Sequence, residues 1–149
     1  MSNLFTQCRE AVIESLQGDT RFGDIATWYE HKDGLRQRYQ IDPAHCPYVA
    51  VYPQEVDQDE PTNAMKRRPY GLRVECGHAG QNAEPAEQFA WDFLDWVSER
   101  KDDHLGMGDT GLSGIQVDGA PVRMLPRQEA PKIIWVARFS LTFTWRISL

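Results

Sequence analysis

The last eighteen residues, KIIWVARFSLTFTWRISL (132–149), contain neither glycine nor proline and alternate in polarity. From Trp135 to Leu149 every odd position is apolar, whereas the even positions are mostly arginine, serine and threonine. A period of two predicts a β-strand with one buried face. At about 3.3 Å per residue this strand would reach about 50 Å, against about 17–20 Å for a typical strand. We therefore expect it to bend at a bulge or to pair in part with something outside its own domain.

The size and composition of the chain predict a single domain, residues 1–149. With 149 residues, 41% apolar and 26% charged, the chain can bury a core without disulfides or a metal. It has no apolar run of about eighteen residues, so we expect no membrane span. The charged start, MSNLFTQCREAVIESLQ, lacks a small-residue cleavage site and argues against a secretory signal. We expect synthesis in the cytoplasm, where Cys8, Cys46 and Cys76 would stay reduced.

Hydrophobic periodicity predicts two helices and several strands. The helices are expected at 3–17, with Gly18 placed to end the first, and at 84–101, with acidic residues in its first turn and basic residues in its last. Strands are expected at 25–31, 48–52, 70–76, 115–117 and 122–125, besides the terminal run, with a turn at Asp118-Gly119 and a long flexible loop at 53–69. This order predicts an α+β fold, with a mostly antiparallel sheet of four to six strands and two helices packed on one face.

Two short patterns suggest chemistry. The stretch GMGDTG (106–111) matches the letters of a dinucleotide-binding loop, which requires a strand before it and a helix after it. Here the expected order is reversed, so we interpret the stretch as a flexible helix-to-strand connection. The residues His45, Cys46, Cys76 and His78 are potential zinc ligands. Adjacent side chains diverge in an extended chain, so we expect buried or surface thiols rather than a metal site.

No signature of a catalytic nucleophile, a phosphate-binding loop or a metalloprotease occurs in the sequence. We therefore predict a protein that is not an enzyme, has no catalytic residues and holds no cofactor. The net charge of −6 also predicts no tight binding to nucleic acid, because such binding depends on lysines and arginines that neutralise phosphates.

Surface charge suggests self-association. The 53–69 loop is acidic first and basic at its end, and Asp92, Asp95 and Glu99 form an acidic ridge on the second helix. An acidic ridge of this kind is usually just a solvated surface. Trp91 lies off the apolar face of the same helix, and the simplest interpretation is a partly covered surface tryptophan. The alternative is a head-to-tail contact that closes into a ring, with the basic end of the loop on a neighbour's ridge and the spare backbone of the terminal strand completed by another copy. The candidate interface residues are Lys66, Arg67, Arg68, Trp91, Arg138, Thr142, Thr144 and Arg146.

The order of elements resembles the tail terminator and tail-completion proteins of tailed bacteriophages, a head–tail joining family. The resemblance covers nearly the whole chain and lies in a short helix (4–16), a strand pair with a loop (48–76), a sheet-packing helix (86–101) and a last strand with alternating aromatics (135–149). It implies a subunit of a hexameric ring without catalytic residues. Such a ring forms in the host cytoplasm during assembly, caps the tail tube in the virion and docks onto the head connector.

Two other functions are compatible with the sequence. A small cytoplasmic protein-binding or inhibitor module could cover a partner with Trp28, Tyr29, Trp91 and the terminal strand. A small enzyme could have a dispersed site near Cys76 and His78.

Overall fold

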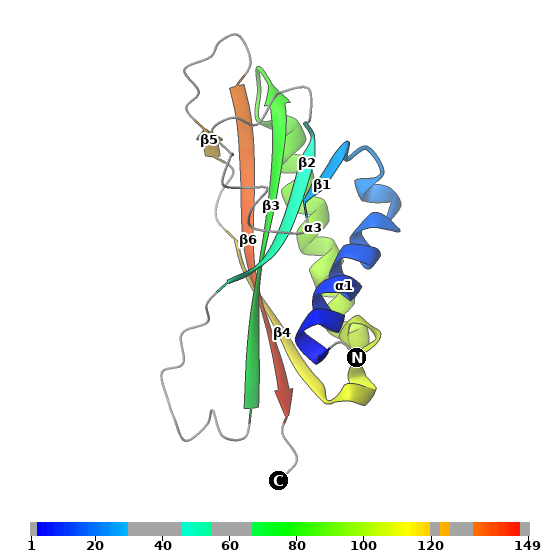
Figure 1. Cartoon of the computed structure of the whole chain (residues 1–149). Helices are drawn as coiled ribbons and strands as arrows, with labels where there is room; N and C mark the ends of the chain where they lie inside the picture. Colours follow the sequence, from blue (N-terminus) through cyan, green and yellow to red (C-terminus); the bar gives the residue numbers. More distant parts are fainter. Residues whose placement is uncertain (1–2, 30–45, 55–66, 120–122, 126–132, 147–149) are drawn as a thin grey trace.

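The computed structural model describes residues 3–29, 46–54, 67–119, 123–125 and 133–146. Its helices are α1 (Leu4–Gln17) and α3 (Glu84–Asp103), and its strands are β1 (Thr27–Tyr29), β2 (Tyr48–Gln54), β3 (Arg67–Gly80), β4 (Leu112–Gly119), β5 (Arg123–Leu125) and β6 (Ile133–Arg146). The strands form one sheet in the order β1-β2-β3-β6-β4, with β5 also paired to β6. Both helices lie on the same side of this sheet (Figure 1). The predicted α+β fold is confirmed.

The sheet is mostly antiparallel. Only β1 and β2 run parallel among the described strand pairs, whereas β3 pairs antiparallel with both β2 and β6. Helix α1 starts at the N-cap Asn3, whose side chain accepts a hydrogen bond from the Thr6 amide, and ends at Gly18, as expected. Among the described residues, no helix is both long enough and apolar enough to cross a lipid bilayer.

The expectation that the terminal strand outruns its neighbours is wrong. Strand β6 pairs with β3 from Ile133↔Gly80 to Arg146↔Arg67, which is its whole described length. Its other edge pairs with β4 and β5. The pairing is continuous because β3 is as long as β6, with 14 residues each. Strand β6 is therefore an interior strand, and its described backbone leaves no long template for another copy.

The predictions for a turn, for a bulge and for the length of a loop also need correction. The turn predicted at Asp118-Gly119 is absent, because β4 runs through both residues and β5 continues along the same edge of β6. The break in register lies in β4, between Leu112 and Gly114, rather than in β6. The 53–69 loop is shorter than expected, because β2 reaches Gln54 and β3 begins at Arg67. The remainder of that loop, 55–66, lies outside the described residues.

The main core lies between the helices and the sheet. From Ala137 to Trp145 the odd residues of β6 are buried, as the alternation predicts. They pack against apolar side chains of both helices, among them Val12, Leu16, Phe93 and Trp96. Nearer the start of β6, Ile134 and Val136 are buried in a second, smaller cluster with Tyr48 and Ala50. These alternate positions place the smaller cluster on the sheet face away from the helices.

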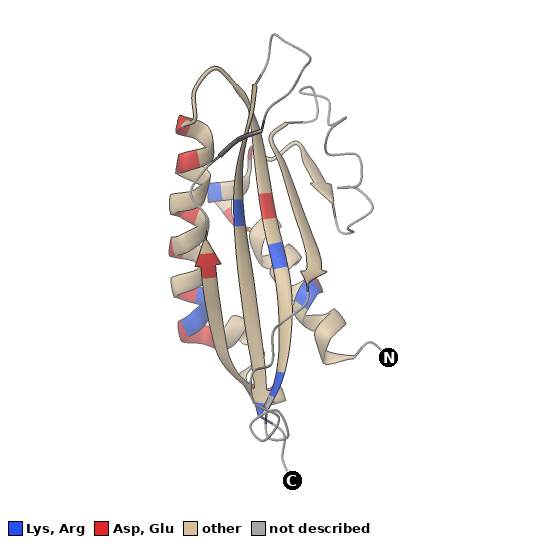
Figure 2. Ribbon diagram, turned by 90° about the vertical axis from the view of Figure 1, so that its left-hand side faces the viewer, with Lys and Arg blue, Asp and Glu red and all other residues tan. Residues whose placement is uncertain are grey.

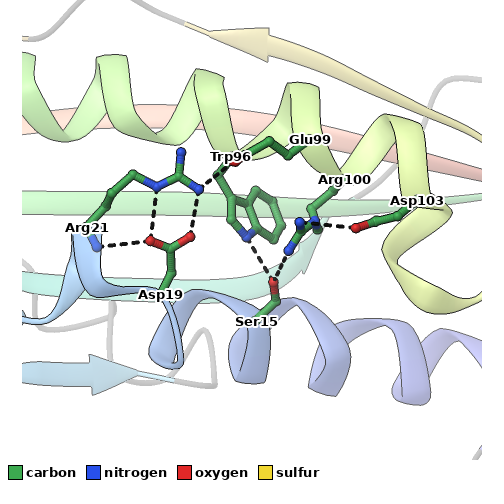
Figure 3. Close-up of polar contacts among 7 residues, drawn as sticks. All are labelled: Ser15, Asp19, Arg21, Trp96, Glu99, Arg100 and Asp103. Carbon is green, nitrogen blue, oxygen red and sulfur yellow. Dashed lines mark hydrogen bonds and ion pairs between the residues drawn. The ribbon is translucent and has the colours of Figure 1, made fainter.

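Polar contacts join the two helices at their edges (Figure 3). Ser15 Oγ of α1 accepts hydrogen bonds from Trp96 Nε1 at 2.9 Å and from Arg100 Nη1 at 3.2 Å, both on α3. A second link follows α1, where Arg21 contacts the carboxylates of Asp19 and Glu99. Trp96 is 1% exposed, so Ser15 satisfies a donor that water cannot reach.

The connection from α3 to β4 consists of two short 3₁₀ helices, His104–Gly106 and Gly108–Thr110. Its backbone has positive φ at His104, Leu105, Gly106 and Gly111. The side chains of Leu105 and Met107 are buried, which anchors the connection to the core. A strand follows the glycines, as expected, so GMGDTG does not lead into a helix N-terminus that could hold a pyrophosphate.

Candidate functional site

Four of the predicted interface residues lie on β6. Arg138, Thr142, Thr144 and Arg146 occupy alternate positions, so they share the sheet face that the helices do not cover. The side chains of Arg138, Thr142 and Thr144 are partly buried and that of Arg146 is exposed. The structure therefore brings these four residues together in one row.

Arg138 is engaged within its own chain. Its Nε atom donates a hydrogen bond to Glu75 Oε1 at 2.6 Å, and Glu75 is 0% exposed. Tyr48 Oη donates to the other carboxylate oxygen of Glu75 at 2.8 Å. Burial, followed by the charge of Glu75, raises the pKa of Tyr48, so its hydroxyl stays protonated and remains a donor. A buried carboxylate with two donors mainly orders this part of the sheet.

A second polar group continues this row. Gln54 Oε1 accepts hydrogen bonds from Arg73 Nε at 3.0 Å and from Ser140 Oγ at 3.3 Å. It links β2, β3 and β6 across the same face. Arg73 and Glu75 occupy alternate positions of the strand expected at 70–76, so the sequence places them on one face. It carries no signal for the residues that they contact.

An open cavity of about 180 Å³ lies at the end of the sheet where β3 begins and β6 ends. Phe5 and Trp145 supply aromatic surface, with ring centroids 5.6 Å apart, and Phe5 also stacks on Tyr70. Arg68 and Arg146 are exposed on its lining, and neither has an ion-pair partner among the described residues. The remaining lining residues are Asn3, Leu4 and Thr110. Sequence reasoning named both arginines but gave no indication that they flank a cavity.

The outer face of α3 carries the other charged surface. Trp91 is 67% exposed and Leu94 is 44% exposed, which places both off the buried stripe. Glu87 and Asp95 are exposed four residues before and after Trp91, on the same side of the helix. Acidic residues recur along α3, which has Arg100 and Lys101 in its last turn. Basic residues also lie midway along the long strands and at their end (Figure 2). The predicted acidic ridge is divided, because Glu99 pairs with Arg21 and Asp92 accepts from Gln88.

Two predicted interface residues are not described in full. Lys66 lies outside the described residues. Arg67 is the first residue of β3, paired with Arg146, but its side chain is outside the described part of the structure.

Cys76 and His78 form a close pair, with Sγ and Nδ1 3.4 Å apart. Burial raises the pKa of the Cys76 thiol well above its ordinary value, and burial lowers the pKa of His78. Both shifts favour the neutral forms, whereas a catalytic cysteine needs a thiolate stabilised by a nearby cation. Cys76 and His78 are therefore as close as a catalytic cysteine and its base, but their environment does not stabilise a thiolate.

The cysteines and histidines give no metal centre in the described part of the chain. No group of three or more His, Cys, Asp or Glu side chains there is arranged to hold an ion. His45 lies outside the described residues, and Cys8, Cys46 and Cys76 are not joined by a disulfide.

A comparison with known protein-family models and with curated protein sequences finds no match to this chain.

Proposed function

We propose that this chain is a structural protein of a bacteriophage or prophage tail. It assembles in the host cytoplasm into a ring that caps the tail tube, enters the virion tail and joins the tube to the head connector. Its partners are other copies of itself, the tail tube protein and the head-connector protein.

The separation of opposite charges on the surface carries this proposal. Arg68 and Arg146 lie at one end of the long strands, whereas Glu87 and Asp95 lie on the outer face of α3. Two complementary surfaces at different places on one chain favour heterologous contacts, in which each copy uses one surface on each neighbour. Heterologous contacts that close by rotation give rings.

The order of elements gives further support. A short first helix, a strand pair, a long sheet-packing helix and a last strand with alternating aromatics are also the order of the tail terminator family that the sequence resembles. The net charge of −6 suits a ring through which DNA passes, because an acidic protein does not bind phosphates tightly. The neutral Cys76–His78 pair disfavours the alternative of an enzyme at that place.

Deletion of the gene for this chain from the phage or prophage that carries it tests the proposal. Negative-stain microscopy of the lysate should reveal tails of irregular length and heads without joined tails, and a plasmid copy should restore joined tails of uniform length. Normal, joined tails in the deletion lysate would exclude the proposed role. A small inhibitor module, by contrast, would leave virion shape unchanged.

A further inference from the structure

The exposed tryptophan of α3 is a candidate for a contact with another chain. Trp91 is 67% exposed, and Leu94 beside it is 44% exposed. Tryptophan is a residue type enriched at the energetically dominant centres of protein interfaces. We call Trp91 with Glu87, Leu94 and Asp95 the knob.

The cavity at the far end of the sheet has the matching properties. Its volume of about 180 Å³ exceeds that of several water molecules, at about 30 Å³ each, so it can accept a large side chain. Phe5 and Trp145 offer aromatic surface. Arg68 is the cross-strand partner of Trp145 and offers a cation on the same sheet face, and Arg146 lines the cavity at the end of β6. Guanidinium groups bind both carboxylates and the faces of aromatic rings. We call Phe5, Arg68, Trp145 and Arg146 the socket.

The knob and socket of one chain cannot meet. Arg68 is twelve residues before the end of β3 at Gly80, which is about 40 Å along a strand. Helix α3 then returns beside the sheet (Figure 1), and Trp91 is seven residues into it, which is about 10 Å. About 30 Å therefore separates the two features along the sheet, so a contact between them requires two copies.

We infer that Trp91 of one copy inserts into the socket of the next copy, where Glu87 and Asp95 pair with Arg68 and Arg146. The inference rests on the proposed function and names the contact that builds its ring. The two carboxylates lie about 6 Å along the helix on either side of Trp91, so both can reach cations that flank one cavity. The contact is heterologous, as a ring requires.

The experiment uses paired charge reversals on the full-length chain. One variant reverses the knob, Glu87→Arg with Asp95→Arg, and the other reverses the socket, Arg68→Glu with Arg146→Glu. Native mass spectrometry and sedimentation should find that each variant alone needs at least tenfold more protein to assemble than the wild type. Trp91→Ala should weaken assembly to a similar degree. The control Glu10→Arg with Glu14→Arg reverses two exposed carboxylates on α1 and should assemble normally.

Mixing the two variants gives the decisive result. A reversed knob fits a reversed socket, and the normal knob of the second variant fits the normal socket of the first. The mixture should therefore assemble into rings in which the two variants alternate, with an even number of copies. A single chain that carries all four substitutions should also assemble alone.

The outcomes separate this inference from the proposed function. If wild-type rings persist in both single variants, or if the mixture does not assemble, the knob-and-socket contact is wrong although the ring stands. If the wild type is monomeric up to about 1 mM, the contact is tested by the ability of each variant gene to rescue the gene deletion. Neither variant alone should then restore tail length, and both together should restore it. Rescue by either variant alone overturns the contact, and a deletion without a tail defect overturns the proposed function. A monomer whose deletion has no defect overturns both.

Discussion

The ring of Tyr48 lies over the backbone of Gly77, so that a Cβ atom on residue 77 would come within 2.0 Å of Tyr48 Cε1. The two residues are also cross-strand partners of β2 and β3. This arrangement explains how a large aromatic side chain can be fully buried on the sheet face without helices.

Gly77→Ala should therefore destabilise the chain, by about 1–3 kcal/mol, because the new methyl group has no space. The measurement is urea unfolding followed by tryptophan fluorescence. Gly80→Ala is the matched control on the same strand, since a Cβ there would have nothing within 4 Å. In a Tyr48→Ala background the cost of Gly77→Ala should largely disappear, and an undiminished cost would contradict the explanation.

Arg138→Met should lower the free energy of unfolding by about 3 kcal/mol, because it leaves the carboxylate of Glu75 buried without its cation. The partial exposure of Arg138, 28%, places the expected loss at the lower end of the range for such pairs. Chemical denaturation measures it. Adding Glu75→Gln should recover part of the loss, since it removes the buried charge and keeps an oxygen that accepts from Tyr48. A double variant as unstable as Arg138→Met would show that the charge is not the cause.

Ser15→Ala should cost about 1–3 kcal/mol, because it removes the acceptor of the buried Trp96 indole N–H and of Arg100. The same substitution at the exposed Ser98 of α3 is the matched control and should change stability by less than about 0.5 kcal/mol. Thermal unfolding of the two variants in parallel compares them. Equal midpoints would mean that water replaces Ser15.

The stability of the chain should fall as the pH drops below about 6.5, the ordinary pKa of histidine. Burial lowers the pKa of His78, so the unfolded chain takes up a proton that the folded chain refuses between its lowered pKa and 6.5. The slope from this group is at most about 1.4 kcal/mol per pH unit. Urea unfolding of the wild type and His78→Gln at several pH values should give a flatter dependence for the variant. The other histidines are present in both chains, so parallel curves would contradict the assignment.

Cys8 and Cys76 should resist iodoacetamide in the folded chain, because both are fully buried. Burial also raises the pKa of the Cys8 thiol to about 12 and that of Cys76 well above 9.0. Peptide mass spectrometry should find both modified only after unfolding, whereas the partly buried Cys46 reacts earlier. Rapid native labelling of Cys76 would instead indicate an activated thiol and revive the enzyme alternative.

Periodicity in the sequence was sufficient for both helices and for the buried face of β6. Glycine at position 18 and the charges at the ends of 84–101 located helix ends to within two residues. These signals are local, because capping and amphipathic patterns depend on neighbours three or four positions away.

Strand length was not predictable in the same way. The sequence predicts a strand at 70–76, from the residue after Pro69 to Cys76. Strand β3 includes Pro69 and continues to Gly80. Pro69 pairs with Thr144, two residues outside the described pairing of β3 with β2, which ends at Gly71. The partner decides how far a strand extends, and no local pattern names the partner. For the same reason the sequence could not predict that Arg138 pairs with Glu75. It also could not predict that Arg68 and Arg146 line one cavity.

The two ends of the described chain meet at one place. Asn3 and Arg146, the first and last described residues, line the same cavity. A purification tag on either terminus would be joined within three residues of Asn3 or Arg146 and could compete with an incoming tryptophan, so tagged protein would understate self-assembly. A short peptide that joins the original ends would permit a circular permutant opened at the exposed residues Gln81 and Asn82, next to the far end of β3. That rearranged chain would carry its tag away from the socket.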